Sequence, residues 1–244
     1  MTDFRDGDTS IHYEVSGSGF PLLLIAPGAM DSAISMWRGA TINPLDLYGD
    51  AFQMIAMDQR NAGRSFGPLE PSDPWGAYAS DQLALLDHLG IDRFHVMGAC
   101  IGGPFALKLI ERAPTRVAAA VLEQPVGMTA ENRPLYDQMW RSWAARLSRR
   151  FDLNADEIES FGTEMWRHEF VLSVSREFLR KCSTPMLVLP GTDSFHPAET
   201  AHEIARLAQA ASVVDPWNDS DEHVRSASEA VREFLLLHSP RQSA

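Results

Sequence analysis

The first candidate for chemistry is a cysteine held in a glycine-rich segment. Residues 98–102 read GACIG, with Cys100 at the centre and Gly103 next in the chain. Residues 93–97 form a short apolar run that favours a strand, and residues 104–111 have helical periodicity. The chain must therefore pass from strand to helix through a tight turn, where glycines remove the Cβ atoms that would collide. Such a turn exposes one side chain, and here that side chain is a thiol.

The thiol of Cys100 is expected to be free and reactive. Cys100 and Cys182 are the only cysteines of the chain, and a disulfide between them would be unusual in a reducing compartment and would silence Cys100. Cys182 is expected to be a small packed residue. A thiolate at a helix N-terminus is favoured by the helix dipole and attacks carbonyl carbon atoms. The sequence thus predicts an acyl group bound covalently to Cys100.

The GACIG segment resembles the nucleophile elbow of the α/β-hydrolase superfamily, which is usually written GxSxG, with cysteine in place of serine. Dienelactone hydrolases have cysteine at this place, and GACIGG also fits the GxCxGG box of polyhydroxyalkanoate synthases. The sequence leaves open whether Cys100 is native or was introduced for serine. The resemblance implies an α/β-hydrolase fold and a triad that follows the order nucleophile, acid, base along the chain.

Asp193 is the expected acid of this triad. It follows the predicted strand 185–190 in a Gly-Thr-Asp step, and open α/β sheets gather functional groups at the carboxyl ends of their strands. The step also resembles the acid-bearing loop of the superfamily. Glu123, at the end of the predicted strand 118–123, stays an alternative, because some of these hydrolases take their acid from that strand. We assign His196 to the entry of the next helix rather than to the chemistry.

His223 is the base that the resemblance implies. The superfamily keeps its general base between the last strand and the last helix, and His223 lies between the predicted strand 212–214 and the final helix. Cys100, Asp193 and His223 then follow the order of the superfamily. Acidic residues that neighbour His223 in the sequence could also approach it.

Two backbone amides are expected to form an oxyanion hole. The superfamily usually has His-Gly-x after its first parallel strand, and the amide of x helps to bind the oxyanion. Here the segment reads Pro27-Gly28-Ala29, so the resemblance implies the Ala29 amide. The Ile101 amide is the second expected donor, because it follows the nucleophile at a helix N-terminus where unpaired N–H groups point outward.

These residues predict a hydrolase that cleaves an activated ester, lactone or thioester of a small apolar substrate through a Cys-His-Asp triad. An acyltransferase with the same acyl-cysteine intermediate, or a binding module on the hydrolase fold, stays open. A basic set of arginines could hold a carboxylate or the phosphates of a coenzyme A thioester, although a solvated face is the expected role. The set is Arg141, Arg146, Arg149 and Arg150.

The elements that must position these residues alternate between strand and helix. Residues 4–17 predict an antiparallel hairpin, and later apolar runs predict the buried strands of a mostly parallel sheet with helices on both faces. The further strands are expected at 21–26, 52–57, 93–97, 118–123, 185–190 and 212–214. The fold class is therefore α/β, and the resemblance makes it an α/β-hydrolase fold.

One segment interrupts this alternation. Residues 124–184 have no convincing strand, and their aromatic residues recur at helical spacing. The resemblance implies that they form a small helical lid inserted into a core made of residues 1–123 and 185–244. The side chains expected to line the substrate pocket are Met30, Trp140, Trp143 and Trp166.

Composition and net charge limit the kinds of partner that we expect for this chain. The chain has 244 residues, of which 45% are hydrophobic, and its net charge is −12, so we expect one domain that binds neither nucleic acid nor an anionic membrane. The histidines lack the close spacing of metal ligands and no dinucleotide fingerprint occurs, so neither a metal nor a cofactor is expected. The first ten residues hold no apolar run, which favours the cytoplasm. We expect a small-molecule substrate, and the sequence leaves a homo-oligomer open.

Overall fold

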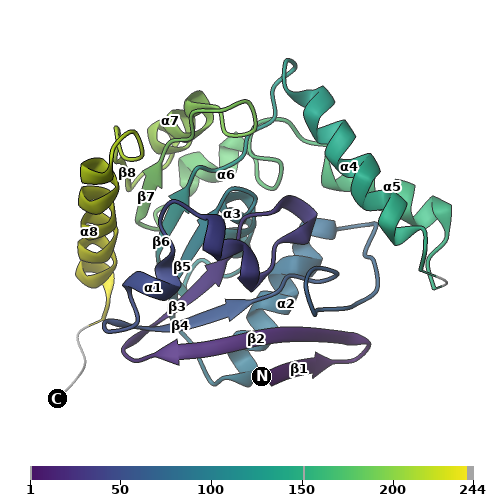
Figure 1. The fold of residues 1–244 in the computed structure, drawn as a ribbon, viewed down its shortest axis with the longest axis horizontal. Helices are drawn as coiled ribbons and strands as arrows, with labels where there is room; N and C mark the ends of the chain where they lie inside the picture. Colours follow the sequence, from purple (N-terminus) through teal and green to yellow (C-terminus); the bar gives the residue numbers. More distant parts are fainter. Residues whose placement is uncertain (1, 151, 241–244) are drawn as a thin grey trace.

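A mixed sheet of eight strands organises residues 2–150 and 152–240, which are the residues that the computed structural model describes. The strand order is β1-β2-β4-β3-β5-β6-β7-β8 (Figure 1). The β1–β2 and β2–β4 pairs are antiparallel, and the other pairs of neighbours are parallel. The strands are β1 (Thr2–Asp6), β2 (Thr9–Gly17), β3 (Phe20–Ile25), β4 (Phe52–Met57), β5 (Phe94–Ala99), β6 (Val117–Glu123), β7 (Met186–Leu189) and β8 (Ala211–Val213). The predicted fold class is confirmed.

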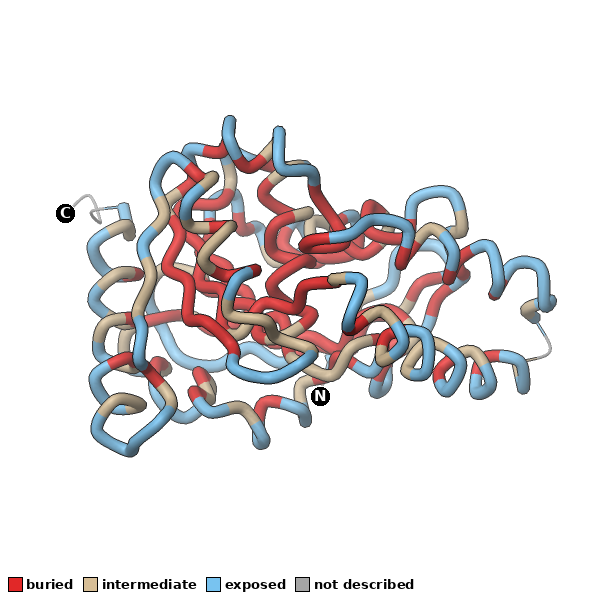
Figure 2. The backbone as a smooth tube through the Cα atoms, turned by 90° about the horizontal axis from the view of Figure 1, so that it is seen from above, coloured by how far each residue is buried: buried red, intermediate tan, exposed pale blue. Residues whose placement is uncertain are grey.

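Helices cover both faces of this sheet because the central strands are apolar on both sides. In β3, Leu23 and Ile25 belong to one buried cluster, and Leu22 and Leu24 belong to the other. Figure 2 shows the buried chain concentrated in the middle of the molecule. The helices are α1 (Pro44–Leu47), α2 (Pro74–His88), α3 (Gly102–Arg112), α4 (Arg133–Leu147), α5 (Ala155–Met165), α6 (Arg176–Lys181), α7 (Ala198–Leu207) and α8 (Asp221–His238), with the 3-10 turns η1 (Ala29–Asp31) and η2 (Ile34–Gly39).

The two faces are closed by different helices. α2 and α3 contribute Tyr78, Leu85 and Phe105 to the first cluster. α8 contributes Val231 and Leu235 to the second cluster. The carboxyl ends of the parallel strands are left for the connecting loops, and this edge of the sheet positions the candidate site.

Residues 124–150 and 152–184 contain α4, α5 and α6 and no strand beyond an isolated bridge between Met128 and Phe170. α4 and α5 pack against each other at one end of the molecule, opposite α8 (Figure 1). α6 packs against α7. The division into core and lid that the sequence predicts stays a prediction, although the helical content of this segment agrees with it.

Among the residues that the structure describes, none of the helices is both long and apolar enough to span a membrane.

Candidate active site

Cys100 lies in the turn between β5 and α3 with a strained backbone. Its φ angle is 57°, in the left-handed region that residues other than glycine rarely adopt. A Cβ atom on Gly98 would lie 2.1 Å from the Gly102 carbonyl oxygen, and one on Gly102 would lie 2.3 Å from the Ile25 carbonyl oxygen. Both glycines are therefore required by close backbone contacts. The Cys100 amide donates to the carbonyl oxygen of Glu123 at 2.9 Å, which ties the turn to β6.

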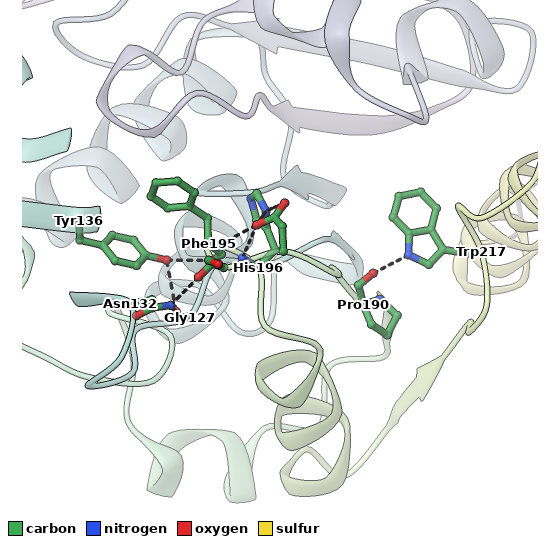
Figure 3. Close-up of polar contacts among 9 residues, drawn as sticks. Gly127, Asn132, Tyr136, Pro190, Phe195, His196 and Trp217 are labelled. Atoms are coloured by element: carbon green, nitrogen blue, oxygen red, sulfur yellow. Dashed lines mark hydrogen bonds and ion pairs between the residues drawn. The ribbon is translucent and has the colours of Figure 1, made fainter. Parts of the chain in front are cut away.

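His196 and Asp193 form a close pair on the loop between β7 and α7. The Nδ1 atom of His196 lies 2.8 and 2.9 Å from the two carboxylate oxygens of Asp193. The same carboxylate accepts hydrogen bonds from the backbone amides of Phe195 and His196. Although partial burial opposes it, the hydrogen bond from His196 holds the pKa of Asp193 below its usual value. Figure 3 shows the His196 imidazole on this loop.

The other side of the His196 imidazole faces Cys100. The Nε2 atom is buried and has no partner of good hydrogen-bond geometry among the described residues. Burial by itself lowers the pKa of His196, but interactions with Cys100 and Asp193 outweigh that effect and raise it to about 9. Cys100 and His196 line the same cavity, where a thiolate would stabilise the imidazolium, and a loose contact of this kind is common before substrate binds.

A glycine and the helix α4 hold this loop in place. A Cβ atom on Gly191 would lie 2.2 Å from the Cβ atom of His196, so only glycine lets the loop fold back this tightly. The Tyr136 hydroxyl of α4 donates to the Phe195 carbonyl at 3.0 Å. Asn132 donates through Nδ2 to the carbonyls of Gly127 at 2.7 Å and of Ser194 at 2.8 Å. These contacts, drawn in Figure 3, fix the backbone on the N-terminal side of His196.

The structure places His223, the base expected from the sequence, away from a hydrogen bond with the nucleophile. The His223 imidazole, on the exposed first turn of α8, pairs with Asp219, and no hydrogen bond between His223 and Cys100 occurs among the described residues. Ser220 caps the helix by accepting from the His223 amide at 3.2 Å. The loop before it is held by Trp217, whose indole donates to the Pro190 carbonyl at 2.6 Å. The imidazole next to Cys100 is that of His196.

The two acids expected from the sequence, Asp193 and Glu123, also have different hydrogen-bond partners. Asp193 contacts His196 directly, whereas the side chain of Glu123 makes its hydrogen bond with the Ile42 amide at 3.2 Å. The spacing Asp-x-x-His in residues 193–196 could have indicated the pair, because three residues of a turn suffice to bring these side chains together.

A cavity of about 410 Å³ opens onto Cys100 and His196. Its other lining residues are Gly28, Ala29, Met30, Asp31, Met139, Ser142, Trp143, Arg146 and Phe195. Met30 and Trp143 line this cavity, and their contact with substrate stays a prediction. Trp140 and Trp166 line a separate groove between α4 and α5, because the Trp140 ring packs on Gly162 instead. Met139 and Phe195 are pocket residues that the sequence analysis did not identify.

The expected oxyanion donors flank the turn. Ala29 has a φ angle of 55° and begins η1 at the wall of the cavity. Ile101 is buried at the start of α3, directly after Cys100. Its amide belongs to the first turn of a helix, where N–H groups lack a partner within the helix. The roles of both amides stay predictions.

A family model for the alpha/beta hydrolase fold matches residues 21–221, a range that contains Cys100, Asp193 and His196. The chain belongs to the alpha/beta hydrolase family. Among curated relatives of this chain, a putative carbamate hydrolase RutD from Azorhizobium caulinodans is 31% identical over 119 residues, which cover 48% of this chain and 41% of the relative. The match thus spans less than half of that relative's length.

Solved structures resemble this chain over nearly its whole length. A hydrolase from Pseudomonas aeruginosa PA01 has a TM-score of 0.72 and 22% identity, with 96% of this chain and 97% of that chain covered. A meta-cleavage product hydrolase from Pseudomonas fluorescens IP01 has a TM-score of 0.69 and 18% identity, with 98% of each chain covered. At these identities the likeness concerns the fold.

Two arginines of the basic set, Arg146 and Arg150, pair with side chains of this chain. Arg146 donates to both carboxylate oxygens of Asp31 at 2.6 and 2.5 Å, which joins α4 to η1 at the mouth of the cavity. Arg150 donates to Asp152 and to Asn61. Both side chains of the Arg146–Asp31 pair are half exposed, so water screens it and its contribution to stability is small. No group of side chains suited to a metal ion occurs in residues 2–150 and 152–240.

Proposed function

We propose that this chain hydrolyses an activated ester, lactone or thioester with a small apolar acyl group through a covalent thioester at Cys100. The observation that carries the proposal is that Cys100 and His196 line one cavity, with Asp193 hydrogen-bonded to the far side of the His196 imidazole. In this proposal Cys100 is the nucleophile, His196 is the general acid and base, and Asp193 orients the imidazole. His196 thus takes the role that the sequence analysis gave to His223.

The first half of the proposed reaction transfers the acyl group. The sulfur of Cys100 attacks the carbonyl carbon, and the Ala29 and Ile101 amides bind the oxyanion that forms. The intermediate then collapses as the bond to the leaving oxygen or sulfur breaks, and the His196 imidazolium donates its proton to that leaving group. Asp193 favours the charged form of the imidazole, so the proton is available for this donation.

The second half releases the acid. The neutral His196 imidazole takes a proton from water, and the resulting hydroxide equivalent attacks the thioester carbonyl carbon. The carbon–sulfur bond breaks, the carboxylic acid leaves, and the sulfur and imidazolium are restored. Thiolates are good leaving groups, so activated acyl groups suit this nucleophile better than amides do.

The cavity supports a small, uncharged acyl group. Met30, Met139, Trp143 and Phe195 supply most of its apolar wall. Arg146 is the one arginine that lines it, and Asp31 already neutralises its charge. We therefore favour hydrolysis of apolar substrates over a coenzyme A acyltransferase, for which free cations would be needed.

Hydrolysis of a panel of p-nitrophenyl esters, thioesters and lactones tests the proposal. We expect turnover by the wild type and by Cys182→Ala, whose cysteine is buried away from the cavity, and loss of turnover in Cys100→Ala. Short apolar acyl chains should react fastest. Turnover that survives in Cys100→Ala would contradict the proposal. Transfer of the acyl group to an added alcohol in preference to water would replace hydrolysis by acyl transfer.

A further inference from the structure

Glu123 is a buried carboxyl group that the proposed reaction does not use. It is the last residue of β6, and in the sheet it is paired with Ala99, the residue before Cys100. Its carbonyl oxygen accepts the Cys100 amide at 2.9 Å. Its side chain is completely buried. A carboxyl group in such a place requires an explanation, because acidic side chains are rarely buried without a cationic partner.

The hydrogen bonds of this side chain do not satisfy a carboxylate. The Oε1 atom accepts from the Ile42 amide at 3.2 Å, and the Oε2 atom has no hydrogen-bond partner among the described residues. None of the ion pairs in the described part of the chain includes Glu123. One long hydrogen bond is little compensation for a dehydrated negative charge. The geometry therefore favours the neutral acid.

Three titratable groups come toward Glu123 from the elements around it. Cys100 follows Ala99, the partner of Glu123 in β5, and His196 lies on the loop that follows Leu189, the partner of Glu123 in β7. Tyr48 lies at the end of α1, the helix that follows Ile42. The Tyr48 hydroxyl donates to the Ser228 carbonyl at 3.0 Å, and burial raises its pKa. Tyr48 is therefore neutral, which leaves His196 as the cation that interacts with Glu123.

The pKa values of Glu123 and His196 agree with this arrangement. Burial raises the pKa of Glu123 to about 8, against the smaller opposing effects of the Ile42 amide and of His196. The pKa of His196 is about 9, so both groups titrate in the same range. When two groups interact and titrate in the same pH range, the charge of each group changes the pKa of the other.

We propose that Glu123 is a positioning residue that acts on the reaction through His196. Its neutral carboxyl lets the imidazolium give up its proton to the leaving group in the acyl-transfer half of the reaction, and its ionisation at alkaline pH holds that proton in place. Glu123 thus sets the pH at which His196 switches between acid and base. This inference rests on the proposed function, because it assumes that His196 must both donate and accept protons.

Titration of His196 by NMR tests the inference without a substrate. The full chain is labelled with ¹⁵N-histidine and titrated from pH 5 to 11, with His196→Gln assigning the signal. Glu123→Gln keeps an oxygen for the Ile42 amide but cannot ionise. We expect its His196 midpoint to fall, by up to about one pH unit, since the opposite charge of an ionised Glu123 stabilises the imidazolium. The exposed Glu229→Gln should leave the midpoint unchanged.

An unchanged His196 midpoint in a folded Glu123→Gln variant would overturn the inference. If that variant does not fold, infrared spectroscopy of the His196→Gln variant gives the reciprocal test, since the carboxylic-acid band of Glu123 should persist to higher pH without the imidazolium. A band with the same pH dependence in wild type and variant would also overturn it. The proposed function fails separately, when no substrate acylates Cys100, and that result does not depend on Glu123.

Discussion

The carboxylate of Asp193 accepts hydrogen bonds from both the imidazole and the backbone amide of His196, at 2.8 and 3.0 Å. The acid and the proposed base therefore lie on one tight turn, three residues apart. The backbone hydrogen bond fixes the carboxylate, and the carboxylate in turn fixes the ring. A single loop, between β7 and α7, carries both Asp193 and His196. Their pairing therefore does not depend on the position of the loop before α8.

Removing the charge of Asp193 should slow the reaction strongly. In Asp193→Asn the amide cannot stabilise the imidazolium, so we expect the pKa of His196 to fall from about 9 and kcat/KM to drop by at least about 100-fold. Ester hydrolysis measures the rate, and NMR of labelled histidine measures the pKa. The matched control is Asp219→Asn, which makes the same change beside His223. A loss of equal size in that control would argue against the pairing of Asp193 with His196.

The hydroxyl of Tyr136 should stabilise the loop that carries His196. Tyr136→Phe leaves the Phe195 carbonyl without its 3.0 Å donor, so the free energy of unfolding should fall by about 1–3 kcal/mol and kcat should fall more than KM changes. Denaturant unfolding and steady-state kinetics measure these effects. Tyr78→Phe is the control, because the buried Tyr78 hydroxyl has no partner among the described residues. That substitution should cost less stability and leave kcat unchanged.

The turn that carries Cys100 should not tolerate a methyl group on Gly102. In Gly102→Ala the new Cβ atom would lie 2.3 Å from the Ile25 carbonyl oxygen, and backbone atoms cannot move aside as a flexible side chain can. We expect a loss of about 1–3 kcal/mol in unfolding free energy, seen as a lower midpoint in thermal unfolding. Gly39→Ala, where no atom lies within 4 Å of the added Cβ, should be nearly neutral. Equal stability of the two variants would contradict the tight turn.

Stability should depend on pH through Glu123. Its pKa of about 8 in the folded state lies above the value of 4.5 for a free glutamate, so the folded state binds more protons between these limits. The contribution of Glu123 is therefore complete below pH 4.5 and is lost as pH rises through 8, with a slope of about 1.4 kcal/mol per pH unit. Glu123→Gln should remove this slope.

The difference in unfolding free energy between wild type and Glu123→Gln separates the contribution of Glu123 from that of His95. Burial lowers the pKa of His95 to about 4, so its contribution is present above pH 6.5 and is lost as pH falls through 4. The two slopes have opposite signs where they overlap. Unfolding free energies measured at several pH values for both proteins should therefore diverge as pH rises. Parallel curves would mean that Glu123 is already ionised in the folded state.

Local sequence predicts the framework well because each strand carries its own signal. The apolar runs at 21–26 and 52–57 correspond to β3 and β4, and GACIG corresponds to the turn before α3. Strands buried on both faces must be continuously apolar, and a turn with such close backbone contacts needs glycine. Neither requirement depends on distant parts of the chain.

The base and part of the pocket depend on tertiary contacts that local sequence does not contain. His223 and His196 both follow a strand and precede a helix, and only the folded loops decide which one reaches Cys100. Trp217 holds the last loop against Pro190, while Gly191 lets the other loop fold back. Trp140 and Trp143 likewise share a helix face by their spacing, yet Trp140 packs on Gly162 and Trp143 lines the cavity.

Intact-protein mass spectrometry of acylated Cys100 tests the central claim most directly. Wild type, His196→Ala and His223→Ala are mixed with excess p-nitrophenyl ester, quenched in acid and weighed, and peptide mapping locates the acyl group. We predict that His196→Ala accumulates one acyl group on Cys100, because water cannot be activated, while wild type and His223→Ala turn over without accumulation. An acyl-enzyme that accumulates in His223→Ala, with normal turnover in His196→Ala, would contradict the assignment of His196.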